Sequence, residues 1–344
     1  MIMASHRVTD SLTSGAGRPA TARRIKYVVA VLVVFTLPMW IGAYPVSMLT
    51  MVGFYAILAL GLVLLTGLAG QVSLGQAMFY GMGAYLSALL TTRAGVNPWS
   101  AIAVSALATG GVAALVGLAI LRLRGIIVAG VTLTVNLLFY YLVTSMGPVT
   151  GGSTGLAGIP RLPYPGGVSY STFIFLLVWL VVGVLLVFSL NIVRSRSGRA
   201  LRVLNVLAGG SEDTAQVLGI NTIKYKVSAY VVAAVFASIG GSIFAHYARV
   251  IEPGTFDVQT SVLVAIMVIV GGVTTPWGAL IGAALMIGIT EVLRTVAPIV
   301  LGGPTGAYEL VAYGAVLVAT LLFLPDGLHS LPERLRRWRT HGDK

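Results

Sequence analysis

The sequence contains no cysteine, and only 9% of its residues are charged. The absence of thiols excludes disulfides and thiolate metal sites. The scarcity of charge excludes an ordinary soluble domain of 344 residues, whose surface would carry many more Lys, Arg, Asp and Glu side chains. Bilayer hydrocarbon requires no such charged surface, and 57% of the residues are hydrophobic. The composition therefore indicates a polytopic helical membrane protein.

Catalytic and metal-binding motifs are also missing from the sequence. The phosphate-binding pattern Gly-x-x-x-x-Gly-Lys-Ser/Thr and the zinc pattern His-Glu-x-x-His do not occur. The four histidines are scattered, without the spacing of a ligand set. We therefore expect no enzymatic activity, no bound metal and no cofactor in this chain. If the chain transports a solute actively, the energy comes from an ion gradient or from a partner subunit.

Basic residues outnumber acidic residues by 22 to 10, and most of them flank apolar runs. In a soluble protein this excess would suggest nucleic-acid binding, but beside apolar runs it is typical of the cytoplasmic side of a membrane protein. Four clusters stand out, in residues 1–26, 122–124, 191–226 and 326–344. We expect the two terminal clusters to be cytoplasmic tails, the first of them disordered, and residues 27–325 to form the transmembrane domain.

Apolar runs predict a bundle of about ten membrane helices. With ten passes, all four basic clusters and both termini lie on the cytoplasmic side; eight passes also place both termini there if two segments are re-entrant. The third run is rich in glycine and polar residues and is predicted to be a broken helix, and the eighth run is short. The runs cover residues 27–43, 47–65, 67–90, 99–121, 126–146, 171–190, 227–247, 260–270, 279–293 and 308–324.

The polar loop 191–226 is predicted to contain a short helix outside the membrane. Ser211 is a good N-cap, and Glu212 and Asp213 follow in the first turn, where acidic side chains suit the helix dipole. Gly219 is a suitable helix stop. Such a helix is either a solvated linker or a docking site for a soluble partner.

The broken third run is the predicted substrate pathway. Gln71, Ser73 and Gln76 are polar groups at membrane depth, and unwound backbone is tolerated there only where it is covered by protein or lines a cavity. On the fifth run, Thr132 and Asn136 are four residues apart and share a helix face. The alternative is close packing, in which glycines let helices approach and the polar side chains pair across helices. The glycines concerned are Gly70, Gly75, Gly81 and Gly83.

Several sequence blocks resemble one transporter family. Asp213-Thr214-Ala215, followed after three residues by Gly219, is similar to the Glu-Ala-Ala-x-x-x-Gly loop of ABC importer permeases. Across roughly residues 50–325, the chain resembles the longer permease type of branched-chain amino acid importers. The blocks are Gly-Leu-Ala-Gly-Gln-Val-Ser-Leu-Gly-Gln-Ala (67–77), Arg-Leu-Arg-Gly (122–125) followed by Thr-Leu (132–133), Thr-Gly-Gly-Ser-Thr-Gly (150–155), and Gly-Gly-Val through Trp-Gly-Ala-Leu-Ile-Gly (271–282).

The docking loop departs from the family pattern. Members of the family usually carry a charged run after the Gly-Arg-Ala segment, whereas residues 203–210 of this chain read Val-Leu-Asn-Val-Leu-Ala-Gly-Gly. The Glu-Ala-Ala core is replaced by Asp-Thr-Ala. The surface for a partner is therefore expected to be altered.

The resemblance implies a permease that works within a larger complex in the cell inner membrane. It implies a second, non-identical permease, two ATPase subunits that use ATP, and an extracytoplasmic binding protein that delivers the substrate. Alternating access would follow from partners that bind one state better than the other. The implied ATPase-docking residues are Arg199, Arg202, Ser211, Glu212, Asp213, Ala215, Gly219 and Asn221, and the implied binding-protein contacts are Thr150, Ser153 and Thr154.

Branched-chain amino acids are the substrates that the resemblance implies, and amides and urea are handled by near relatives. One alternative is a gradient-driven transporter, which requires an intramembrane carboxylate. Only Glu291 and Glu309 lie near the spans, and Glu291 is expected to pair locally with Arg294. Another alternative is an ABC permease for simple sugars. The blocks at 67–77 and 271–282 favour the amino acid branch.

Overall fold

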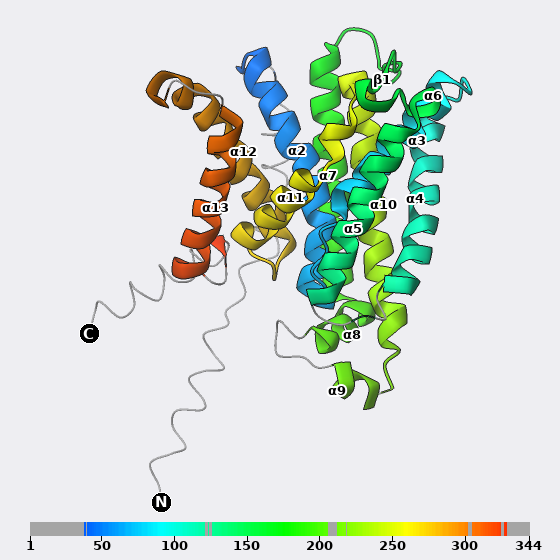
Figure 1. Ribbon diagram of the computed structural model, residues 1–344, viewed down its shortest axis with the longest axis vertical. Helices are drawn as coiled ribbons and strands as arrows, with labels where there is room; N and C mark the ends of the chain where they lie inside the picture. The colour runs from blue at the N-terminus through cyan, green and yellow to red at the C-terminus, as the bar shows by residue number, and fades with distance from the viewer. Residues whose placement is uncertain are drawn as a thin grey trace, which may run out of the picture. The chain divides into compact units, whose positions relative to one another are not determined.

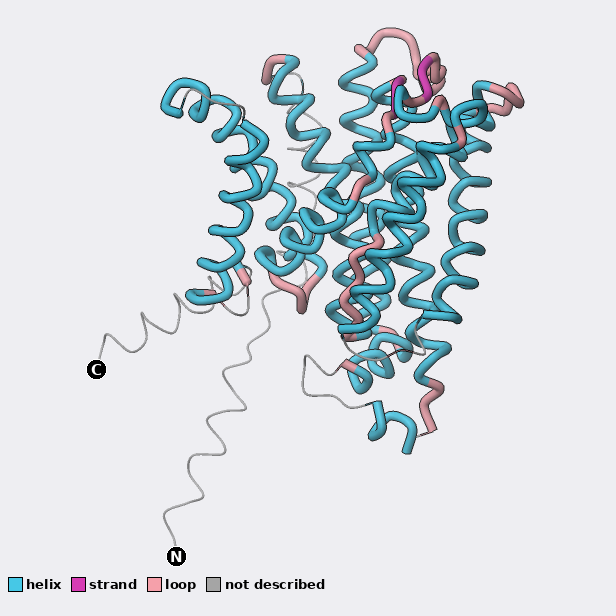
Figure 2. Tube along the Cα trace, in the orientation of Figure 1, coloured by secondary structure: helices cyan, strands magenta, loops and turns pink. Residues whose placement is uncertain are grey.

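The computed structural model describes residues 38, 40–120, 123, 126–205, 212–217, 219–301, 305–324 and 327–328. These residues form helices almost throughout, with one short two-stranded sheet (Figures 1 and 2). The long helices are α2 (Ala43–Val63), α3 (Gln76–Thr92), α4 (Pro98–Ile120), α5 (Ile126–Ser145), α7 (Tyr170–Arg194), α10 (Thr222–Ala248), α11 (Val258–Gly271), α12 (Pro276–Leu301) and α13 (Thr305–Phe323). The shorter helices are η1 (Leu64–Leu68), α6 (Gly147–Thr150), η2 (Gly152–Thr154), α8 (Arg196–Leu204), α9 (Glu212–Val217) and η4 (Pro253–Phe256).

These helices confirm the predicted all-α membrane fold. Within the described residues, seven helices are long and apolar enough to cross a membrane; α3 has 17 residues, and α13 contributes the shorter apolar segment Glu309–Phe323. Each of the nine predicted spans from 47–65 onward coincides with one of the long helices. The first predicted span, at 27–43, lies mostly outside the described residues, as do the tail 1–26 and nearly all of 326–344.

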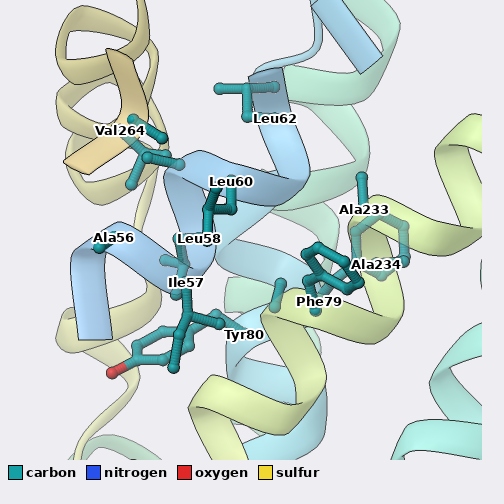
Figure 3. Close-up of a cluster of buried hydrophobic side chains, with 14 of the residues drawn as sticks. Ala56, Ile57, Leu58, Leu60, Leu62, Phe79, Tyr80, Ala233, Ala234 and Val264 are labelled. Atoms are coloured by element: carbon teal, nitrogen blue, oxygen red, sulfur yellow. The ribbon is translucent and has the colours of Figure 1, made fainter. Parts of the chain in front are cut away.

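Helix α2 lies in the hydrophobic core. Its residues from Ala56 to Val63 are all buried, so side chains on every face of the helix meet other protein groups. A helix that is apolar all round is expected in such a position. Figure 3 shows side chains of α2 beside Phe79 and Tyr80 of α3, Ala233 of α10 and Val264 of α11. The core is therefore built around α2.

Helices α3, α4 and α10 pack against one another. Glycines allow α3 and α10 to meet backbone to backbone: a Cβ on Gly83 would lie 2.2 Å from the Ser238 carbonyl oxygen, and one on Gly241 would lie 1.9 Å from that of Tyr80. Ser238 Oγ also donates to Thr109 Oγ1 of α4 at 3.0 Å. Small residues at close crossings are typical of membrane helices.

Helices α11, α12 and α13 form a second packed group. Gly278 and Gly282 of α12 lie against the backbone of α11, since a Cβ on Gly282 would come within 1.8 Å of the Met267 carbonyl oxygen. The Gly278-x-x-x-Gly282 pair therefore serves helix packing.

The small sheet pairs strand β1 (Leu156–Ala157) with strand β2 (Val250–Ile251) in antiparallel register. We call this end of the bundle the β1–β2 end, and the opposite end the α8–α9 end (Figure 1). Residues 249–259, between the predicted spans 227–247 and 260–270, contain β2, η4 and the start of α11. Counted from Pro253, the short eighth span reaches 19 residues, enough to cross a membrane.

Candidate functional site

The predicted helix break lies between η1 and α3. Residues 70–75 are non-helical, and Gly70 adopts a φ of 64°, which glycine tolerates best. Side chains from two other helices accept hydrogen bonds from backbone N–H groups at the break. Leu74 N–H donates to Thr132 Oγ1 at 3.0 Å, and Ala77 N–H donates to Ser261 Oγ at 2.9 Å. The break is thus held by α5 and α11, as unwound backbone at membrane depth requires.

Gln76, at the first turn of α3, connects three helices. Its side chain is 1% exposed, and Nε2 donates to the carbonyl oxygens of Leu58 in α2, at 3.3 Å, and Ala233 in α10, at 3.0 Å. Ser73 Oγ accepts from the Gly75 N–H at 3.3 Å, within the break itself. Gln76 therefore makes the cross-helix pairs that the packing alternative predicted.

Two other predicted pathway residues have unsatisfied amide groups. Asn136 is fully buried, and neither its Oδ1 nor its Nδ2 has a hydrogen-bond partner among the described residues. The Oε1 atom of Gln71 is also buried without a partner there. Thr132 lies one turn before Asn136, and its hydroxyl is already paired: it accepts from the Leu74 N–H and donates to the Ala129 carbonyl oxygen. Buried polar groups are rarely left unpaired, so these two amides are the polar groups most available to a ligand or to another conformation.

The loop at the α8–α9 end contains two helices, of which sequence reasoning predicted one. Ser195 caps the missed helix α8 by accepting from the Gly198 N–H at 3.1 Å. A Cβ on Gly198 would lie 2.1 Å from the Ile192 carbonyl oxygen, so α8 folds tightly against the end of α7. The Ser195 cap was the available signal, but glycine three residues later disfavours a helix by propensity alone.

Arg199 and Arg202 project from α8 back to α7. Arg199 Nη1 donates to the Arg194 carbonyl oxygen at 3.2 Å, and Arg202 Nη2 donates to that of Val193 at 2.5 Å. Cations suit the C-terminal end of a helix, where carbonyl groups lack intrahelical partners. Both side chains remain exposed, so they are accessible to a partner while fixing the angle between α7 and α8.

Helix α9 is the predicted short helix. Ala215 is fully buried, whereas the apolar side chain of Val217 is 88% exposed. The helix ends at Gly219 as predicted: φ is 74°, Gly219 N–H donates to the Gln216 carbonyl oxygen at 2.9 Å, and Ile220 N–H donates to that of Ala215 at 3.0 Å. This is the Schellman arrangement.

The remaining residues predicted to dock an ATPase are either not described or belong to another helix. The predicted Ser211 cap and the side chains of Glu212 and Asp213 fall outside the described residues. Asn221 belongs to the next helix, because its Oδ1 caps α10 by accepting from the Lys224 N–H at 3.1 Å.

In the loop that precedes β1, the three residues predicted to contact a binding protein differ in exposure. Thr150 is buried, and its Oγ1 donates to the carbonyl oxygens of Val143 and Met146 at 2.6 and 2.9 Å. Ser153 and Thr154 are exposed. A binding protein can therefore reach Ser153 and Thr154, whereas Thr150 holds the loop in shape.

Sequence reasoning missed a cavity of about 410 Å³ toward the β1–β2 end, lined by residues of α2, α3, α10, α11, α12, α13 and the η4 region. Arg294 of α12 lies in its wall, and Arg294 Nε donates to Glu309 Oε1 of α13 at 3.2 Å. The helical spacing of Glu291 and Arg294 predicted a local pair, and in the structure Arg294 pairs with Glu309 from a different helix. The sequence does not predict this cavity, because its lining residues are far apart in the chain.

The chain matches the family model described as branched-chain amino acid transport system / permease component over residues 44–321. It is 28% identical over 335 residues to the high-affinity branched-chain amino acid transport system permease protein LivM of Salmonella typhimurium strain LT2. It is 29% identical to the protein of the same name from Escherichia coli strain K12. Each alignment covers 90% of this chain and 76% of the relative. No solved structure matches.

The family match spans all the long helices of the bundle, from the start of α2 into the last turn of α13. With seven helices long and apolar enough to cross a bilayer in the described part alone, the protein is a multi-pass inner-membrane protein. The chain therefore belongs to the permease components of branched-chain amino acid ABC transport systems.

Proposed function

We propose that this chain is the transmembrane permease subunit of an ABC importer that moves branched-chain amino acids inward by alternating access. Two ATPase subunits dock at the α8–α9 end and supply the energy from ATP. A second, non-identical permease and an extracytoplasmic binding protein complete the complex. The proposed substrate is taken from the names of the two relatives. Amides and urea are the other solutes to be compared.

The observation that carries this proposal is the exposed helix α9. The fully buried Ala215 holds it to the protein, while the apolar Val217 is presented outward. An exposed apolar side chain on a short helix outside the membrane suits a protein partner. Helix α8 is fixed to α7 by Arg199 and Arg202, so a force on the loop reaches a membrane helix directly.

The test is co-purification. The full chain is solubilised from its native membranes with residues 212–217 either intact or replaced by a Gly/Ser linker of equal length. We expect an ATPase to co-purify with the intact chain and to be lost with the replacement. If no ATPase accompanies the intact chain, the proposal is wrong. Thermal stability of both chains shows whether the replacement leaves the bundle folded.

A gradient-driven transporter is the second candidate, because Glu291 and Glu309 both line the cavity. Glu309 is largely buried, with 13% of its side chain exposed, and it is paired with Arg294. A carboxylate held in an ion pair is poorly suited to releasing and rebinding a proton in each cycle. Uptake that persists in ATP-free vesicles and collapses with a protonophore would favour this candidate over the ABC importer.

A further inference from the structure

The cavity toward the β1–β2 end combines an apolar wall with charges of both signs. Its volume of about 410 Å³ is within the range of small-molecule sites, about 300–1,000 Å³. The apolar wall consists of thioether, aromatic and branched aliphatic side chains. They are Met48, Met51 and Phe54 of α2, Phe244 of α10, Leu263 of α11 and Ile287 of α12.

The positive group of the cavity is Arg294. Its guanidinium carries five N–H donors, and its only recorded hydrogen bond within the described residues uses Nε, to Glu309. The two terminal nitrogens are therefore available to an acceptor, and 62% of the side chain is exposed. Glu309 holds the guanidinium in place. A fixed guanidinium fork is suited to a carboxylate.

Asp257, the N-cap of α11, also lines the cavity and is acidic, as are Glu291 and Glu309. Its Oδ1 accepts from the Thr260 N–H at 3.0 Å and caps the helix. Its second oxygen has no recorded hydrogen bond within the described residues, and the side chain lines the same cavity. Asp257 can therefore accept a hydrogen bond from an ammonium group without giving up the cap.

We propose that this cavity is a permease binding site for a zwitterionic apolar α-amino acid. The carboxylate of the ligand binds Arg294, its ammonium group binds Asp257, and its side chain packs against the wall of Met51, Phe54 and Leu263. This assignment rests on the proposed function and deepens it, because it locates a substrate site within the permease chain itself. Such a ligand offers an opposite charge to Arg294 and to Asp257, whereas a neutral sugar or urea would desolvate both groups without compensation.

The test measures binding of radiolabelled L-leucine to the full chain in lipid nanodiscs, in the absence of ATP. Two competitors each lack one charge of leucine: leucinamide has no carboxylate, and 4-methylpentanoate has no ammonium group. We expect each to compete at least about tenfold more weakly than leucine, since a charge-assisted contact is lost. Galactose and urea are expected not to compete.

The variants assign each charge to its residue. Asp257→Asn keeps a good N-cap and should bind leucine about tenfold more weakly while no longer discriminating against 4-methylpentanoate. Arg294→Gln alone would strand Glu309, so the double change Arg294→Gln with Glu309→Gln is used. It should lose discrimination against leucinamide. The matched control is Arg249→Gln, an exposed arginine near the same end that does not line the cavity, and it should bind as the unaltered chain does.

The inference is overturned if leucine does not bind saturably, if the uncharged solutes compete equally, or if the cavity variants keep full discrimination. These results are separable from failure of the proposed function. If an ATPase co-purifies with the chain but the cavity variants bind leucine as the unaltered chain does, only the binding-site inference is wrong. If the chain discriminates against leucinamide and 4-methylpentanoate but no ATPase co-purifies with it, only the assignment as an ABC importer is wrong.

Discussion

Asn205 Nδ2 donates a hydrogen bond of 2.7 Å to the carbonyl oxygen of Gly67, although the two residues are 138 positions apart. Asn205 follows α8 in the docking loop, and Gly67 lies in η1 just before the helix break. Gly67 also touches the turn between α11 and α12, since a Cβ there would lie 2.0 Å from the Val273 carbonyl oxygen. The docking loop, the break and the α11–α12 turn therefore meet at one glycine.

This contact predicts a role for Asn205 in coupling. Asn205→Ala leaves a carbonyl of the η1 segment without its donor and removes one hydrogen bond between the loop and this segment. We expect the assembled transporter to hydrolyse ATP but to move several-fold less substrate per ATP than the unaltered complex. The measurement is the ratio of uptake to hydrolysis in proteoliposomes. Asn191→Ala, an exposed asparagine near the end of α7, is the control. An unchanged ratio in Asn205→Ala would show that the bond is only structural.

Val217 is predicted to be a docking contact. Burying a valine side chain contributes about 1.5–3 kcal/mol, so Val217→Ser should weaken ATPase association about tenfold or more. Because the side chain is 88% exposed, the thermal stability of the isolated chain should not change. Quantitative co-purification checks this, with Val250→Ser at the opposite end as the matched control. Equal ATPase recovery from both variants would remove Val217 from the interface.

Asn136 should show a conflict between stability and activity. Asn136→Leu replaces an amide whose two polar atoms are unpaired among the described residues, so we expect a melting temperature that is unchanged or higher. If the amide serves the transport cycle, as the pathway prediction states, uptake should fall at least several-fold. Thr132→Val is the contrast, because it removes the Leu74 acceptor and should destabilise the chain. A fully active Asn136→Leu transporter would contradict a pathway role.

The crossing of α3 and α10 should not tolerate a methyl group on Gly241. Its Cβ would lie 1.9 Å from the Tyr80 carbonyl oxygen, so Gly241→Ala must separate the helices. Overpacking of this kind costs about 1–3 kcal/mol, and the melting temperature in detergent should drop. Gly130→Ala on α5 is the control, since no atom lies within 4 Å of the added Cβ. Equal melting temperatures for the two variants would argue against a tight crossing.

Much of the fold could be predicted because each membrane helix carries its own signal. A run of apolar residues must satisfy its backbone internally in lipid, so it becomes a helix whatever its neighbours are. The break after η1 was visible for a similar reason, since the glycines and polar residues of 70–76 interrupt such a run. The end of α9 at Gly219 also followed from a local rule.

Helix α8 and the roles of single polar residues could not be read in this way. Gly198 argues locally against a helix, yet α8 forms because that glycine fits against the end of α7. Gln76 was a candidate for the pathway, but whether it pairs across helices depends on which carbonyl groups of α2 and α10 lie opposite it.

The sequence by itself determined the membrane setting, the helical fold and the place of helix α9, because these depend on local composition and on charges beside apolar runs. Only the tertiary structure decided that Arg294 pairs with Glu309, that Asn205 reaches Gly67, and that Asp257 shares a cavity with Arg294. Each of these relationships joins residues from different helices. Their distances depend on how the helices pack, which no local pattern records.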